Sequence, residues 1–61
     1  MMRKAKRIHL LLRLAEAECE TDLETGRINA LRAINQIHEL GGPMNPYQEE
    51  RLTIVKGRII E

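Results

Sequence analysis

Apolar or small residues recur every three or four positions between Ile8 and Ile37, and this stripe constrains the fold more than any other feature. The 3.6-residue turn of an α-helix produces this spacing, and the phase of the stripe is kept along the whole stretch. The sequence therefore predicts an all-α protein whose first element is one long helix, from about residue 3 to about residue 40. The members of the stripe are Ile8, Leu12, Ala15, Cys19, Leu23, Gly26, Ala30, Ile34 and Ile37.

A break inside this stretch is the alternative. The segment Thr21-Asp22-Leu23-Glu24 has the form of a helix N-terminal capping box, and Gly26 is a weak helix former. Both signals favour three short helices with a break near residues 20–26. The unbroken phase of the stripe favours the long helix, and we expect this arrangement.

A second helix begins after a clear interruption of the chain. Leu40 is followed by Gly-Gly-Pro, a sequence that ends helices. Asn45 is then a suitable N-cap, Pro46 suits the first helical position, and Gln48 is placed for a capping-box contact. These signals predict a loop over 41–45 and a helix from about 46 to 60. We expect one helical domain over residues 1–61, in which the two helices form an antiparallel hairpin.

The size of the chain raises the question of how its core is completed. A domain of 61 residues buries little surface and is usually stabilised by disulfides, a metal or oligomerisation. One cysteine cannot form an internal disulfide, and one cysteine with two distant histidines does not make a zinc site. We therefore expect no metal or other cofactor, and we expect a homodimer.

The shorter helix can cover only the second half of the longer one. This leaves residues 8–19 as an uncovered apolar segment, which marks an interface. Residues 3–13 carry basic but no acidic side chains, and residues 16–24 carry the reverse, so antiparallel pairing of two copies would bring opposite charges together. The residues expected at the interface with a second copy or a protein partner are Ile8, Leu11, Leu12, Ala15, Cys19 and Leu23.

The basic cluster near the N-terminus is a candidate site for nucleic-acid contact. Arg3, Lys4, Lys6 and Arg7 could bind phosphate groups, since lysine and arginine supply most non-specific affinity for nucleic acids. The alternatives are an exposed helix end that pairs with the acidic segment, and contact with an anionic membrane surface. Tyr47 is the only aromatic residue, which argues against binding of single strands through base stacking.

No residue pattern indicates an enzyme. The carboxylates of residues 16–24 occupy several helix faces and form no focused acid–base pair. Cys19 falls on the apolar stripe, where a small buried side chain is the expected role, and His9 and His38 are far apart in the sequence. No apolar run reaches transmembrane length, so a cytoplasmic location is expected.

The basic Met-Arg-Lys-Ala-Lys-Arg start and the helix–Gly-Gly-Pro–helix layout resemble small accessory proteins of lambdoid temperate phages. These proteins are encoded in the early region, between the exonuclease and excisionase genes. The resemblance implies a non-enzymatic modulator of a host or phage protein, acting in the host cytoplasm. The sequence thus favours a homodimeric protein-interaction module, with a small dimeric nucleic-acid-binding regulator as the alternative.

Overall fold

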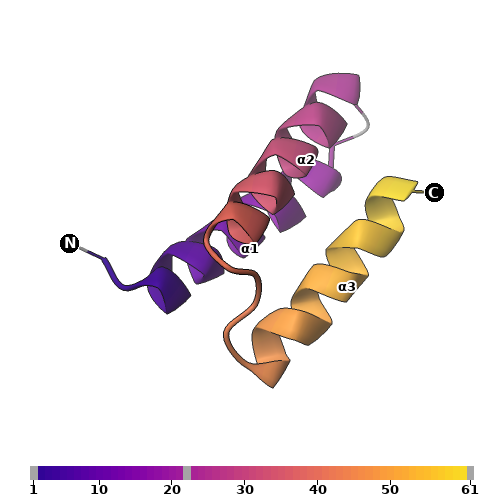
Figure 1. Cartoon of the computed structure of the whole chain (residues 1–61). Coiled ribbons are helices and arrows are strands. Elements are labelled where there is room, and N and C mark those ends of the chain that lie inside the picture. Colours follow the sequence, from indigo (N-terminus) through magenta and orange to yellow (C-terminus); the bar gives the residue numbers. More distant parts are fainter. Residues whose placement is uncertain (1, 22, 61) are drawn as a thin grey trace.

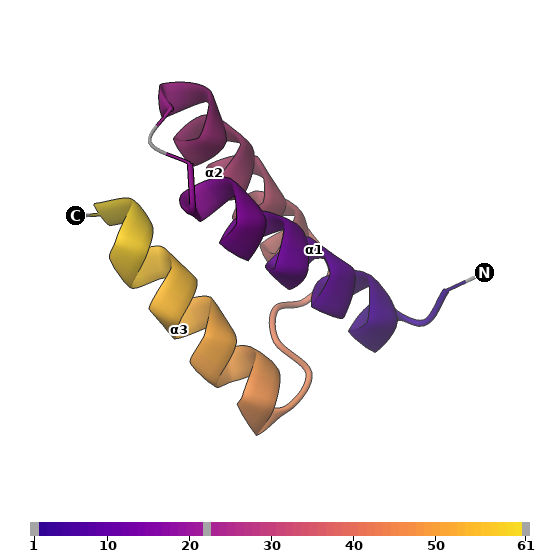
Figure 2. The ribbon, with the colours of Figure 1, turned by 180° about the vertical axis from the view of Figure 1, so that it is seen from behind.

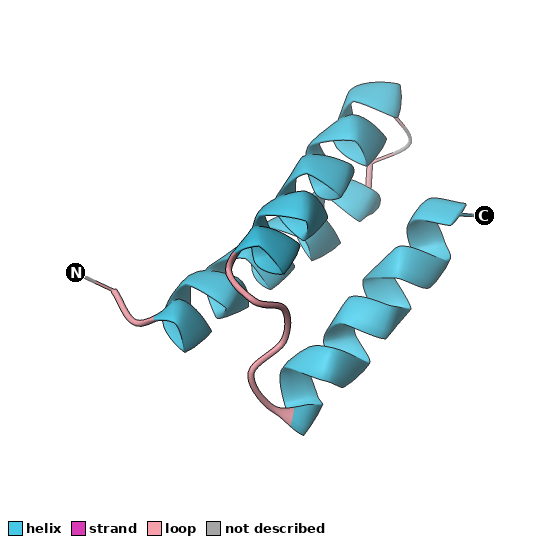
Figure 3. Ribbon diagram, viewed as in Figure 1, coloured by secondary structure: helices cyan, strands magenta, loops and turns pink. Residues whose placement is uncertain are grey.

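The computed structural model describes residues 2–21 and 23–60, which form three helices (Figures 1 and 3). These are α1 (Lys4–Cys19), α2 (Glu24–Glu39) and α3 (Pro46–Ile60), and the described residues include no strand. The all-α prediction is confirmed. The prediction of one long first helix is wrong, and the three-helix alternative fits the structure.

The turn between α1 and α2 interrupts the stripe at its midpoint. The Thr21 hydroxyl donates a hydrogen bond to the carbonyl oxygen of Glu18 at 3.0 Å, which satisfies one of the free carbonyls at the end of α1. Leu23 then adopts an extended conformation (φ −85°, ψ 142°) before α2 begins. A continuous helix would leave its apolar stripe in water, whereas folding back at this turn buries the two halves against each other.

Helices α1 and α2 run antiparallel and pack closely, while α3 runs back beside α1 (Figures 1 and 2). Helix α3 makes more extensive contact with α1 than it makes with α2. The last helix therefore does not form its main contacts with residues 28–40, as the expected hairpin required. Helix α1 is the central element, with α2 and α3 on either side.

The end of α2 confirms the role expected of the two glycines. Gly41 and Gly42 have φ values of 106° and 83°, in the region that glycine adopts without steric cost. The Gly42 N–H donates to the Ile37 carbonyl oxygen at 2.9 Å, and the Gly41 N–H donates to the His38 carbonyl oxygen at 3.0 Å. This is the Schellman arrangement, which ends the helix and turns the chain toward α3.

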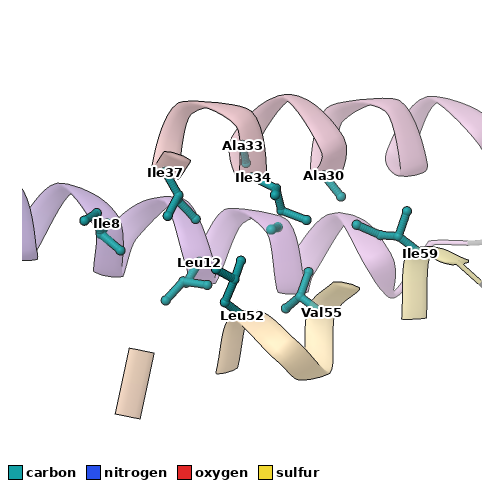
Figure 4. Close-up of a cluster of buried hydrophobic side chains, with 10 residues drawn as sticks. Ile8, Leu12, Ala30, Ala33, Ile34, Ile37, Leu52, Val55 and Ile59 are labelled. Carbon is teal, nitrogen blue, oxygen red and sulfur yellow. The ribbon is translucent and has the colours of Figure 1, made fainter. Parts of the chain in front are cut away.

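The hydrophobic core lies between α1 and the two helices that flank it. Figure 4 shows the side chains of α2 and α3 directed toward α1 from opposite sides. The apolar stripe of segment 8–19, expected to be uncovered, is thus covered by α2 and α3 within one chain, so a second copy is not needed to complete this core. The buried hydrophobic residues are Ile8, Leu12, Ala15, Ala30, Ala33, Ile34, Ile37, Leu52, Val55 and Ile59.

Candidate interaction surface

Helix α1 leaves one face exposed, opposite the side that packs on the core. In the view from behind, α1 runs across the molecule in front of α2 (Figure 2). Leu10 and Leu14 lie one helical turn apart on this face, with 43% and 49% of their surface exposed. We call this the outward face of α1, and its exposed members are Arg3, Lys6, Arg7, Leu10, Arg13, Leu14, Ala17 and Glu20.

The outward face is basic over most of its length and acidic at its end. No acidic residue occurs between residues 3 and 15. Glu20 is exposed where α1 ends, and the half-buried Glu18 lies beside it. Asp22, which also belongs to the acidic segment of the sequence, lies outside the described residues. The outward face thus has an apolar centre, with basic residues toward its N-terminal end and acidic residues at its C-terminal end.

The structure places the predicted interface residues mainly in the core. Ile8, Leu12 and Ala15 are buried, and Leu11 and Cys19 are partly buried against the same cluster. These five are engaged within the chain, and only Leu23 of the predicted set is strongly exposed, at 68%.

Leu10 and Leu14 lie within the segment 8–19 that was expected to be uncovered, but they are not among the six residues predicted for the interface. Their signal was present in the sequence as an i, i+4 apolar pair on the side of the helix opposite the stripe. The sequence did not distinguish this pair from the leucines beside it, because only packing decides which side of α1 is covered.

The four residues predicted to contact nucleic acid are all exposed. Arg3, Lys4, Lys6 and Arg7 surround the first turn of α1, and none of them takes part in an ion pair within the described residues. Arg3 is the N-cap residue and makes no side-chain capping bond, and the first turn contains no acidic residue. These cations oppose the helix dipole, so they do not stabilise α1.

Gln48 fixes the start of α3 against this basic turn. This residue is only 3% exposed. The Gln48 Oε1 accepts from the Met44 N–H at 2.8 Å, and its Nε2 donates to the Ala5 carbonyl oxygen at 2.9 Å. The Gln48 N–H donates to Asn45 Oδ1 at 2.9 Å, which confirms Asn45 as the N-cap. The capping-box contact expected of Gln48 is shifted by one residue, because its side chain accepts from the N–H of Met44 and not from that of the N-cap residue, Asn45.

A second link between α1 and α3 is the pairing of Glu16 with Arg51. Arg51 Nε donates to Glu16 Oε1 at 2.9 Å, and Arg51 Nη2 donates to Glu16 Oε2 at 2.6 Å. The hydrogen bonds from Arg51 lower the pKa of Glu16 despite the opposing effect of burial, and the same bonds raise the pKa of Arg51. Glu16 therefore pairs within the chain and is not free for a partner.

Cys19 borders an open groove of about 510 Å³ between the α1–α2 turn and the end of α3. Arg27 and Arg58 line the groove together with Glu18 and Glu24. Burial raises the pKa of the Cys19 thiol, and Glu16 and Glu18 add to this effect while Arg58 opposes it. The thiol is therefore held in its protonated form, which is a poor nucleophile.

The described residues contain no group of three or more His, Cys, Asp or Glu side chains that could hold a metal ion. Their helices are too short and too polar for any of them to cross a membrane.

In comparison with known proteins, the chain matches no protein-family model, no curated protein and no solved structure.

Proposed function

We propose that this chain is a non-enzymatic protein-interaction module that binds through the outward face of α1. The observation that carries the proposal is the exposed pair Leu10 and Leu14 on a helix whose opposite face already completes the core. Because the core of the single chain is buried without these two leucines, their contribution to folding is small. An apolar pair among arginines is typical of a surface that loses its contact with water when a partner binds.

The chemistry of the face suits a helical or acidic protein surface. Leucine side chains supply apolar contact area, and Arg7 and Arg13 can bind carboxylates in a bidentate manner. An exposed helix face that docks in a groove is a common mode of recognition. The resemblance to phage accessory proteins suggests that the partner is a host or phage protein and that binding modulates its activity.

Capture experiments with matched variants test the proposal. The immobilised chain is exposed to bacterial lysate with and without phage infection, and the retained proteins are identified. The double variant Leu10→Glu/Leu14→Glu removes the apolar pair, and Ile28→Glu, on α2 and 44% exposed, adds a charge elsewhere. We expect retained proteins to bind the wild type and Ile28→Glu but not the double variant. Retention of the same proteins by the double variant would contradict the proposal.

A second candidate function is binding to duplex nucleic acid through Arg3, Lys4, Lys6 and Arg7. It is favoured by the exposure of all four cations and by their unfavourable position at the helix N-terminus. Four phosphate contacts would reduce the affinity for duplex DNA about 100-fold between 50 and 200 mM salt. Replacing the four residues by glutamine should remove this binding, whereas Arg32→Gln on α2 should leave it nearly unchanged. An affinity that does not depend on salt would argue against this function.

A further inference from the structure

The charges of the outward face match those of its own copy in the opposite orientation. Starting from the proposed function of this face, we infer that its occupant is a second copy of the chain. In this dimer, α1 packs antiparallel to α1 of the second copy around a two-fold axis. A surface that is basic at one end, apolar in the middle and acidic at the other end is complementary to itself under such a rotation.

The exposed residues along the face define the register of the pair. Arg7, Leu10, Leu14 and Ala17 follow one another at steps of three and four, the spacing of the contact positions in a two-helix coiled coil. Antiparallel pairing of the two leucines sets Leu10 against Leu14 of the second copy. By symmetry, Leu14 then lies against Leu10 of the second copy, so the apolar centre is covered twice.

The same register brings opposite charges together on both sides of the leucines. Lys6 comes opposite Glu20 of the second copy on one side, and Lys4 comes opposite Glu18 of the second copy on the other. Symmetry repeats each pair, and Glu18 and Glu20 form no ion pair within the described residues. Arg13 meets its own counterpart near the axis, at the edge of the contact, where its long side chain can extend into solvent.

These charges favour the second copy over other occupants and favour antiparallel over parallel pairing. In a parallel pair, the basic halves of the two faces would lie side by side, as would their acidic ends, and the helix dipoles would also repel. An acidic helix of another protein could pair with the basic half of the face, but it would oppose Glu18 and Glu20 with like charge. A second copy complements both halves.

The contact is small, so the dimer is reversible. Helix α1 has 16 residues and is about 24 Å long at the helical rise per residue. One face of such a helix buries less than the roughly 800 Å² per partner of a stable complex. The dissociation constant is therefore expected in the range of about 10 µM to 1 mM.

Sedimentation equilibrium from 10 µM to 1 mM at low salt tests the inference. The wild type should shift from its monomer mass of 7.1 kDa toward twice this value as its concentration rises. Leu10→Glu/Leu14→Glu should remain monomeric. Lys6→Glu and Glu20→Lys should each weaken the dimer at least tenfold, because each places like charges opposite one another twice.

The double variant Lys6→Glu/Glu20→Lys distinguishes this register from general electrostatic attraction. It restores the pair with its charges exchanged, so dimerisation should recover to near the wild-type strength. The dipole of α1 favours both new charges, a glutamate near its N-terminus and a lysine at its C-terminus, so we expect the monomer to remain folded. Circular dichroism measures the helix content of each variant. Arg32→Glu, which is outside the face, should leave the dimer nearly unchanged.

A wild type that stays monomeric at 1 mM would overturn the inference, and so would a double charge variant that shows no recovery. If capture of other proteins still depends on Leu10 and Leu14 in that case, the proposed function stands and the occupant is a different protein. If the dimer forms as described but no other protein is retained through this face, the second copy is its occupant and the wider function fails.

Discussion

Replacing Gly26 by alanine tests the packing that turns the stripe back on itself. Gly26 is buried in the first turn of α2, where it passes the end of α1. A Cβ atom at this position would lie 2.6 Å from the carbonyl oxygen of Glu18 and still closer to the Thr21 hydroxyl. The threonine side chain can rotate only by giving up its hydrogen bond to Glu18, and the carbonyl belongs to the backbone of α1. The two helices must therefore move apart.

The magnitude follows from three contributions. Overpacking in a closely packed interior costs about 1–3 kcal/mol. Loss of the Thr21 hydrogen bond adds about 1 kcal/mol. Alanine gains about 1 kcal/mol over glycine in helix propensity. The net expectation is that Gly26→Ala lowers the free energy of unfolding by about 1–3 kcal/mol, which is a large fraction of the total for a domain of this size.

Gly57→Ala is the matched control. Gly57 is exposed within α3, and a Cβ atom there would meet no other atom within 4 Å. The same substitution should therefore raise the free energy of unfolding by about 0.5–1 kcal/mol. Urea denaturation followed by circular dichroism at 222 nm measures both variants at low protein concentration, with the slope m checked for constancy. A Gly26→Ala variant as stable as the wild type would refute the reasoning.

Three further predictions concern the contacts that hold α1 in place. Glu16→Gln should lower the free energy of unfolding at pH 7, because the pKa of Glu16 is lowered in the folded state. The difference from the wild type should disappear as the pH falls below the ordinary carboxyl range, and urea titrations at several pH values measure it. Gln48→Glu should cost about 2 kcal/mol at pH 7, because a carboxylate cannot donate to the Ala5 carbonyl, and stability should partly recover in acid where the carboxyl is protonated. Leu12→Ala should lower the free energy of unfolding by about 2–5 kcal/mol, whereas Leu14→Ala should change it by less than about 0.5 kcal/mol, as measured by thermal or urea unfolding. Equal effects would mean that the buried and exposed faces of α1 are wrongly assigned.

The helical class and the local structure at both ends of the loop before the last helix were predictable from the sequence. The Schellman end of α2 at Gly41 and Gly42, the N-cap at Asn45 and the span of α3 were all predictable. These features depend on residues within a few positions of one another, through φ values, local hydrogen bonds and the helix dipole. Local chemistry of this kind is fully present in the linear sequence.

Two features depend on contacts between distant parts of the chain: the stripe folds back on itself, and one face of α1 remains in solvent. The core positions of α1 and α2 keep the same 3.6-residue phase across the turn, so periodicity alone cannot distinguish one long helix from two packed ones. Leu23 is in phase with the stripe and yet exposed, because it lies in the turn. The physical reason is that burial depends on partners distant in sequence. With α2 and α3 covering Leu12, the exposed pair Leu10 and Leu14 became the candidate interaction surface.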